Sequence, residues 1–274
     1  MENYICQTSG VQYGESKDHP LQCTICEEER QYVNKEGQQW TTLNELANSK
    51  SYKNVMKDEE EGLFSIKTEP GFGIGQNAYI VQDGSFNLLW DCITYLDEHT
   101  INNINSMGGL HAIALSHPHY YSTQVEWAEN FNCTIYIHED DKDWVTRKSD
   151  RIKFWSGESL ELTERIILQR IGGHYKGATI LEWRKQSNNH GVLLTGDIIR
   201  VVADRNWVSL MYSYPNLIPL PTATVERINQ KLEKLQFASL YDAFNRVIRN
   251  DAKLKVDFSI KRYLAALNGT LFDT

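Results

Sequence analysis

The chain has 274 residues, of which 41% are hydrophobic and 23% charged, which are the values of a globular protein with a sizeable core. Its net charge of −8 argues against a nucleic-acid-binding surface as the main function, and no apolar stretch approaches the ~20 residues of a membrane-spanning helix. The polar start, Met1 to Tyr4, lacks the pattern of a signal peptide. We therefore expect a soluble cytoplasmic protein that binds neither nucleic acid nor membrane, and we leave its oligomeric state open.

Three of the five cysteines lie within the first 26 residues. Cys23 and Cys26 form a Cys-x-x-Cys pair, which is one knuckle of a zinc ribbon. Cys6 opens a segment with the frame of the second knuckle, but Ser9 stands where a fourth cysteine is expected. We interpret residues 1–32 as a zinc-ribbon-like cysteine module in which Cys6, Cys23 and Cys26 bind a structural zinc ion.

This module has no fourth cysteine, and His19 is the nearest candidate for a fourth ligand. Three cysteines indicate zinc less strongly than four, so a vestigial knuckle or a redox pair stays an alternative. The other two cysteines, Cys92 and Cys133, lie singly in apolar surroundings, where we expect buried core thiols.

Residues 33–60 are mostly polar, and we interpret them as a linker that contains a short helix. The sequence Thr41-Thr42-Leu43-Asn44-Glu45-Leu46 is typical of a capped helix start. The charged run at 57–61 indicates a solvated face rather than a binding site.

Residues 61–274 form the predicted main domain, in which strand-like and helix-like patterns are interspersed. An Asp83-Gly84 turn predicts a hairpin. The expected strands are 63–66, 78–81, 88–90, 112–115, 166–168 and 192–194, and the expected helices are 94–107, 123–130, 222–235 and about 252–267. Strands grouped around such helices predict a layered α/β sandwich.

Four candidate metal ligands follow three of these strands. His117 and His119 flank a proline after the strand at 112–115. His174 closes a Gly-Gly-His turn and Asp197 closes a Thr-Gly-Asp turn, each after an apolar run. Loops at the ends of buried strands are common positions for metal sites, and imidazole with carboxylate suits zinc or non-haem iron.

At these residues the chain resembles the metallo-β-lactamase-fold hydrolases, a superfamily that includes glyoxalase II-like thioesterases and lactonases. Their ligand motif is His-x-His-x-Asp-His, followed by a Gly-Gly-His-type turn, a Gly-Asp and a final histidine. The resemblance extends over residues 60 to 245, and the strand that ends at Asp91 looks like the family's early strand with its structural aspartate. It implies a four-layer αββα sandwich of the metallo-β-lactamase type.

The chain departs from this motif at the second metal position. Tyr121 and Ser122 replace the Asp-His pair, and the last histidine of the chain, His190, is no candidate for the final ligand. A neutral phenol and a hydroxyl are poor metal ligands at neutral pH. We therefore predict a mononuclear site in which His117, His119 and His174 hold one ion, with Asp197 as a fourth ligand or a hydrogen-bonded neighbour. Zinc is the expected ion, and iron and manganese are the alternatives.

Aromatic and basic residues supply the remaining candidates. Tyr120 and Tyr121 adjoin the histidines, and we predict that they act with Asp197 in catalysis. Tyr212, Tyr214 and Arg205 are the predicted substrate-binding residues, on a stretch that its prolines predict to be rigid and extended.

These features favour a metal-dependent hydrolase that acts on a small-molecule ester, thioester or lactone through a metal-activated water. The alternative function is that of a non-catalytic metal-binding or redox-linked protein that keeps the fold and one metal. The absence of the Asp-His pair favours this alternative, whereas the complete first set of ligands favours catalysis.

Overall fold

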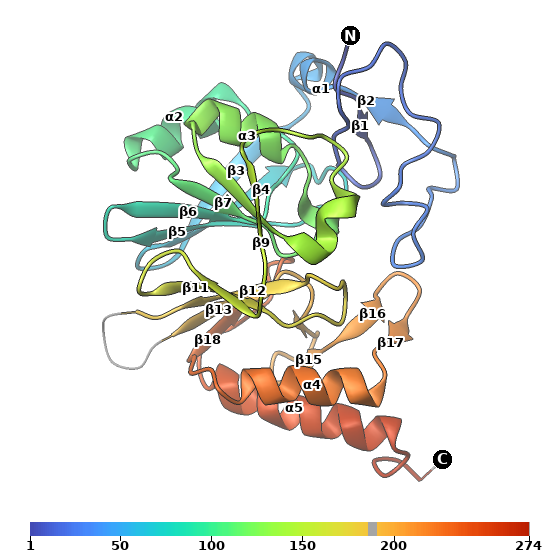
Figure 1. Ribbon diagram of the computed structural model, residues 1–274, viewed down its shortest axis with the longest axis vertical. Helices are drawn as coiled ribbons and strands as arrows, with labels where there is room; N and C mark the ends of the chain where they lie inside the picture. Colours follow the sequence, from blue (N-terminus) through green and yellow to red (C-terminus); the bar gives the residue numbers. More distant parts are fainter. Residues whose placement is uncertain (186–190, 274) are drawn as a thin grey trace. The chain divides into compact units, whose positions relative to one another are not determined.

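The computed structural model describes residues 1–185 and 191–273, so His190 lies outside the described residues. The chain forms two compact units, Met1–Trp155 and Ser156–Thr274, each built on its own β-sheet (Figure 1). In the described part of the chain, no helix is long and apolar enough to cross a membrane.

The first unit contains a seven-stranded sheet in the order β3-β4-β5-β6-β7-β8-β9. Pairing is antiparallel from β3 to β6 and parallel from β6 to β9. The strands are β3 (Lys53–Glu60), β4 (Leu63–Glu69), β5 (Ala78–Asp83), β6 (Phe86–Trp90), β7 (Ala112–Ala114), β8 (Thr134–His138) and β9 (Ile152–Trp155).

Two helices complete the core of this unit. Helix α2 (Glu98–Ser106) contributes Ile104, and α3 (Gln124–Phe131) contributes Trp127, to one cluster of buried side chains that also contains Ile113 and Ile135 of the sheet. The 3₁₀ segments η1 (Pro118–Tyr120) and η2 (Glu139–Trp144) follow β7 and β8. The expected helices at 94–107 and 123–130 are therefore confirmed, with shorter bounds for the first.

The cysteine segment is part of the same unit and shares its core. Strand β1 (Ile5–Cys6) pairs with β2 (Trp40–Thr41), and Val11 and Ile25 belong to the buried cluster of the sheet. The division of the chain at residues 32 and 60 remains a prediction.

The predicted short helix is confirmed as α1 (Leu43–Ser49). Its capping box is complete, since the Glu45 amide donates to Thr42 Oγ1 at 3.2 Å and the Thr42 amide donates to Glu45 Oε2 at 3.1 Å. The rest of the expected linker is different, because residues 53–60 form β3, the first strand of the large sheet. An edge strand tolerates charged side chains, which explains why its sequence looks like a solvated segment.

The second unit contains a six-stranded sheet in the order β10-β11-β12-β13-β18-β19, in which only the β13–β18 pair is parallel. Helices α4 (Thr222–Leu232) and α5 (Ala252–Leu267) pack against each other, and α5 also contacts β18. The strands are β10 (Ser159–Glu161), β11 (Ile166–Arg170), β12 (Thr179–Trp183), β13 (Val192–Leu194), β18 (Ser239–Tyr241) and β19 (Val247–Ile248).

Two small strand pairs lie between β13 and α4: β14 (Arg200–Val201) with β15 (Val208–Ser209), and β16 (Met211–Ser213) with β17 (Ile218–Pro219). The expectation of a rigid extended loop here was wrong, because the proline-rich stretch forms the β16–β17 hairpin. Leu217 has a left-handed φ of 56°, and its amide donates to the Tyr214 carbonyl at 3.3 Å, which closes the turn.

Candidate metal centre

His117 and His119 lie in the segment that leaves β7 and enters α3 through η1. Asp91 fixes the start of this segment, because its Oδ1 accepts a hydrogen bond from the Ser116 amide at 2.7 Å. The Asp91 amide donates to the Ala114 carbonyl at 2.9 Å, and Asp91 has a left-handed φ of 59°. Through these two bonds Asp91 connects the end of β6 to the end of β7 and to the segment that follows it. The structural aspartate that the resemblance implied is therefore present at Asp91.

The two imidazoles of the first unit form one buried cluster with Tyr120. The ring centroid of His117 lies 4.8 Å from that of His119 and 4.5 Å from that of Tyr120. Each histidine is only 1% exposed, and Tyr120 is fully buried. The Ser116 hydroxyl lies 2.8 Å from His117 Nδ1, so this nitrogen is engaged in a hydrogen bond.

Gln31 is a neighbour of this cluster that the sequence analysis missed. Its amide nitrogen lies 3.5 Å from His119 Nδ1, although the two residues are 88 positions apart. A glutamine in a polar segment carries no local pattern, so only the folded chain reveals this contact. The N-terminal segment therefore supplies a polar group beside a candidate metal ligand.

Tyr121 and Ser122, which replace the Asp-His pair of the family motif, both contact backbone carbonyls. The Tyr121 hydroxyl donates to the Asp141 carbonyl at 3.4 Å. The Ser122 hydroxyl donates to the Cys92 carbonyl at 3.1 Å and accepts from the Gln76 amide at 3.1 Å. These two side chains support the structure of the first unit by hydrogen bonding.

His174 and Asp197 are the candidate ligands of the second unit. His174 Nδ1 lies 3.1 Å from the Met211 carbonyl, so this nitrogen carries the proton and Nε2 keeps its lone pair. His174 Nε2 lies 3.8 Å from Asp197 Oδ1, and the two residues are 1% and 6% exposed. The Met211 carbonyl, which belongs to β16, thus orients His174 so that Nε2 is the nitrogen suited to a metal.

The turn before His174 depends on glycine. Gly172 and Gly173 have φ angles of 69° and 88°. A Cβ on Gly173 would lie 2.9 Å from Ile228 Cδ1 and 3.1 Å from Leu220 Cδ1. The backbone beside His174 lies so close to helix α4 that only glycine fits at position 173.

Asp242 is a second residue that the sequence analysis missed. It follows β18, which pairs in parallel with β13, and the Ala243 amide donates to the Gly196 carbonyl at 2.8 Å beside Asp197. Its carboxylate accepts hydrogen bonds from the amides of Val201, Phe244 and Arg246. Burial raises the pKa of Asp242 to about 6 in spite of these bonds.

The predicted substrate-binding residues have different surroundings. The Tyr214 hydroxyl donates to the Ser209 carbonyl at 2.8 Å, and burial, followed by the charge of Asp197, raises the pKa of Tyr214. Arg205 is exposed and Tyr212 is half-buried. The neighbouring Arg200 packs over the rings of Tyr214 and Phe244, at 5.1 Å and 4.4 Å. The roles of Tyr212, Tyr214 and Arg205 stay predictions.

The three N-terminal cysteines are buried and close together, with their sulfur atoms all within 4.8 Å of one another. Hydrogen bonds from the Cys26 and Cys6 thiols hold the pKa of Cys23 below its usual value, and the Cys23 thiolate raises the pKa of Cys26. His19 is not part of this group. It stacks on Trp40 with 5.9 Å between ring centroids, and its Nδ1 lies 2.9 Å from the Pro20 carbonyl. Cys92 and Cys133 are buried core thiols, as expected.

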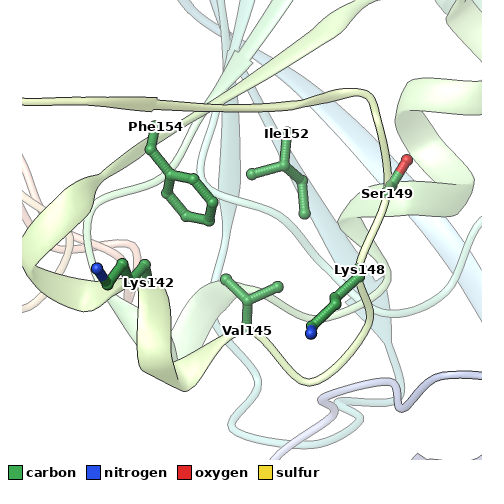
Figure 2. A pocket seen from close by; sticks show the side chains of 6 residues that line it. All are labelled: Lys142, Val145, Lys148, Ser149, Ile152 and Phe154. Atoms are coloured by element: carbon green, nitrogen blue, oxygen red, sulfur yellow. The ribbon is translucent and has the colours of Figure 1, made fainter.

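A cavity of about 280 Å³ lies elsewhere in the first unit. Val145, Ile152 and Phe154 point toward one another around it, and Lys142 and Lys148 stand beside them (Figure 2). Its lining contains none of the candidate metal ligands.

Comparison with known proteins places the chain in a family. It is 57% identical, over 274 residues that cover 100% of both chains, to a protein of Bacillus subtilis (strain 168) described as "Uncharacterized protein YmaE". The chain belongs to the YmaE family. No protein-family model matches the chain.

Solved structures with similar folds are metallo-β-lactamases. The DIM-1 enzyme is 13% identical, with 79% of this chain and 98% of that chain covered and a TM-score of 0.56. A B3 metallo-β-lactamase with an active-site glutamic acid is 14% identical, with 83% and 96% covered and a TM-score of 0.53. The mono-zinc form of FIM-1 from Pseudomonas aeruginosa is 15% identical, with 80% and 94% covered and a TM-score of 0.51. The metallo-β-lactamase fold expected from the resemblance is thereby confirmed.

Proposed function

We propose that His117, His119 and His174 hold one metal ion, with Asp197 as a fourth ligand or a hydrogen-bonded neighbour. The single observation that carries this proposal is the arrangement around His174, where the Met211 carbonyl occupies Nδ1 and leaves Nε2 facing the Asp197 carboxylate at 3.8 Å. Four buried side chains that offer imidazole and carboxylate donors match the chemistry of zinc. Iron or manganese would be the alternative ions.

The contacts of Tyr121 and Ser122 support a single ion rather than two. Each hydroxyl already donates to a backbone carbonyl, and neither side chain is a strong metal ligand. FIM-1, whose fold is similar, has been crystallised in a mono-zinc form, so this fold accommodates one zinc in that protein.

With a metal in place, the site would hydrolyse an ester, thioester or lactone of a small molecule. A bound zinc ion supplies a water of lowered pKa and polarises the attacked carbonyl. Asp197 accepts the proton of the attacking water, because it is the carboxylate beside His174. Tyr120, packed against His117, donates a hydrogen bond to the oxyanion that develops.

The alternative function is non-catalytic metal binding. The near-complete burial of His117, His119 and His174 favours it, because a catalytic metal needs a position open to substrate. Both functions require a bound metal, but only the first predicts that the metal-loaded protein hydrolyses a substrate.

A His119→Ala variant tests both the metal and the activity. We expect it to lose the metal of the histidine site and any metal-dependent hydrolysis of a panel of p-nitrophenyl esters, acyl thioesters and lactones. The matched control is His99→Ala, which removes an exposed histidine of α2 and should change neither. Unchanged metal content in the His119 variant would refute the site, and metal without turnover on the whole panel would favour the non-catalytic alternative.

A further inference from the structure

We propose that Cys6, Ser9, Cys23 and Cys26 form a closed structural zinc site in which the Ser9 hydroxyl is the fourth ligand. This site is separate from the histidine site and does not depend on the proposed hydrolysis. It adds a fourth ligand to the three cysteines expected from the sequence, for which His19 was the nearest candidate.

The sulfur positions fit a single tetrahedral ion. At a zinc–sulfur distance of about 2.3 Å, two thiolates on one zinc lie about 3.8 Å apart. The sulfur atoms of Cys6 and Cys26 are 3.6 Å apart, and all three sulfur atoms lie within 4.8 Å of one another. The five cysteines of the chain are free, so no disulfide explains this closeness.

Ser9 supplies the fourth ligand, which is weaker than a thiolate. Its hydroxyl contacts Cys23 Sγ and accepts from the Val11 amide at 3.3 Å, whereas the Ser122 hydroxyl already donates to a backbone carbonyl. Ser9 Oγ lies 3.3 Å from Cys23 Sγ, and the residue is 2% exposed. In a mixed site with zinc–oxygen and zinc–sulfur distances of about 2.0 and 2.3 Å, the oxygen and sulfur lie about 3.5 Å apart. The hydroxyl therefore stands where the fourth ligand of such a site belongs.

Both chain segments have the geometry of metal-binding knuckles. The amide of Cys26 faces the sulfur of Cys23, and the amide of Ser9 faces the sulfur of Cys6, three residues back in each case. The Glu27 amide donates to the Cys23 carbonyl at 3.0 Å, and the Gly10 amide donates to the Cys6 carbonyl at 2.8 Å. Gly10 has a φ of 78°, which lets the chain turn directly after the serine.

Gln38 contacts the sulfur of Cys6, and its amide fits a thiolate there after rotation. Its side-chain oxygen lies 3.7 Å from Cys6 Sγ, and its buried amide nitrogen has no hydrogen-bond partner within the described ranges. Rotating the amide would turn its N–H group toward the sulfur. A metal-bound thiolate on Cys6 would give this nitrogen its acceptor.

The ligand chemistry selects zinc. Three soft thiolates and one oxygen at four tetrahedral corners suit zinc, and the burial of Cys6, Cys23 and Cys26, at 0%, 0% and 3% exposure, leaves no open coordination position. The ion would anchor the N-terminal segment, whose Val11 and Ile25 pack in the core of the first unit.

The test measures zinc release from the full-length protein with an organomercurial that reacts with thiolates, using a chromogenic chelator as the readout. We expect the wild type to release one zinc per chain, and His119→Ala to release the same amount. Ser9→Cys supplies a fourth thiolate and should slow spontaneous transfer of zinc to the chelator about tenfold or more. Cys133→Ala, which removes a buried thiol outside the site, should behave as the wild type.

Three outcomes would overturn the proposal. They are release of no zinc while all five thiols react, transfer from Ser9→Cys as fast as from the wild type, or a disulfide among Cys6, Cys23 and Cys26 in the native protein by mass spectrometry. The wild-type and Ser9→Cys measurements keep the test decisive even if a Cys23→Ser variant does not fold.

Discussion

Asp197 carries the proton transfer in the proposed reaction, and its role separates catalysis from binding. We expect Asp197→Asn to lower kcat by about 10²- to 10⁴-fold with little change in KM, because a carboxamide cannot accept the proton of water. The measurement is steady-state kinetics on the substrate with the highest turnover, with metal content determined in parallel. A loss confined to KM, with metal retained, would contradict the role of Asp197 as a base.

Tyr120 and Tyr121 are adjacent, but their surroundings predict different effects of losing the hydroxyl. Tyr120→Phe should lower kcat by about 10²-fold if it donates to the oxyanion. From the sequence we expected a catalytic role for Tyr121, but its hydroxyl donates to the Asp141 carbonyl, which favours a structural role. Tyr121→Phe should therefore leave kcat almost unchanged and reduce the free energy of unfolding by about 1 kcal/mol. Equal kinetic effects of the two substitutions would show that the hydrogen bond to Asp141 does not distinguish them.

The raised pKa of Asp242 predicts that the free energy of unfolding falls as the pH rises. Its pKa is raised from 3.8 to about 6 in the folded protein, so the folded chain holds this proton more tightly than the unfolded chain. The stability that protonated Asp242 contributes is therefore fully present below pH 3.8 and is lost as the pH rises through about 6. Two pKa units correspond to about 3 kcal/mol.

Asp242→Asn removes this titration and supplies the comparison. The free energy of unfolding of the wild type minus that of Asp242→Asn should fall by about 3 kcal/mol between pH ~4 and ~7. Urea unfolding followed by circular dichroism at several pH values measures it. A difference that stays constant or grows with pH would contradict the raised pKa.

Among the elements, helix α4 and the Gly172-Gly173-His174 turn are coupled by close packing. Gly173→Ala would place a Cβ 2.9 Å from Ile228 Cδ1 on α4. Gly157→Ala is the matched control, because Gly157 has a nearly equal φ of 91°, compared with 88°, but nothing lies within 4 Å of an added Cβ. Both variants place a side chain at a left-handed φ, and only Gly173→Ala adds the clash.

We expect Gly173→Ala to lose about 1–3 kcal/mol more of the free energy of unfolding than Gly157→Ala. It should also weaken metal binding at His174, because the turn that places the imidazole must shift. Thermal unfolding and metal content of both variants test this. Equal destabilisation would show that α4 adapts without strain.

Sequence patterns predict the elements that carry the ligands, but not their partners. Short apolar runs bounded by turn residues indicated the strands before His117, His174 and Asp197, and these strands are present. The Met211 carbonyl that fixes His174 lies 37 residues away, and any residue type would supply it. A backbone acceptor therefore leaves no trace in the sequence.

Each misinterpreted segment has its own physical reason. Strand β3 lies at the edge of its sheet and carries charged residues, so its pattern is that of a linker. The prolines of the β16–β17 hairpin suggested an extended loop, although a short strand pair accepts Pro219 at its end. Ser9 was seen only as a missing cysteine, because the closeness of its hydroxyl to Cys23 depends on the fold.

At the scale of the whole molecule, the account predicts two kinds of metal site in one chain. The candidate ligands of the histidine site are His117, His119, His174 and Asp197, whereas the cysteine site lies within the first unit. The number of ions at the histidine site is the central claim, because it separates this protein from enzymes with a two-metal centre.

Anomalous diffraction from crystals of the untagged, metal-loaded protein tests this claim most directly. Maps recorded on both sides of the zinc absorption edge identify and count the ions. The account predicts one peak among His117, His119, His174 and Asp197. Two peaks within bridging distance beside these residues, or no peak there in fully loaded protein, would contradict it.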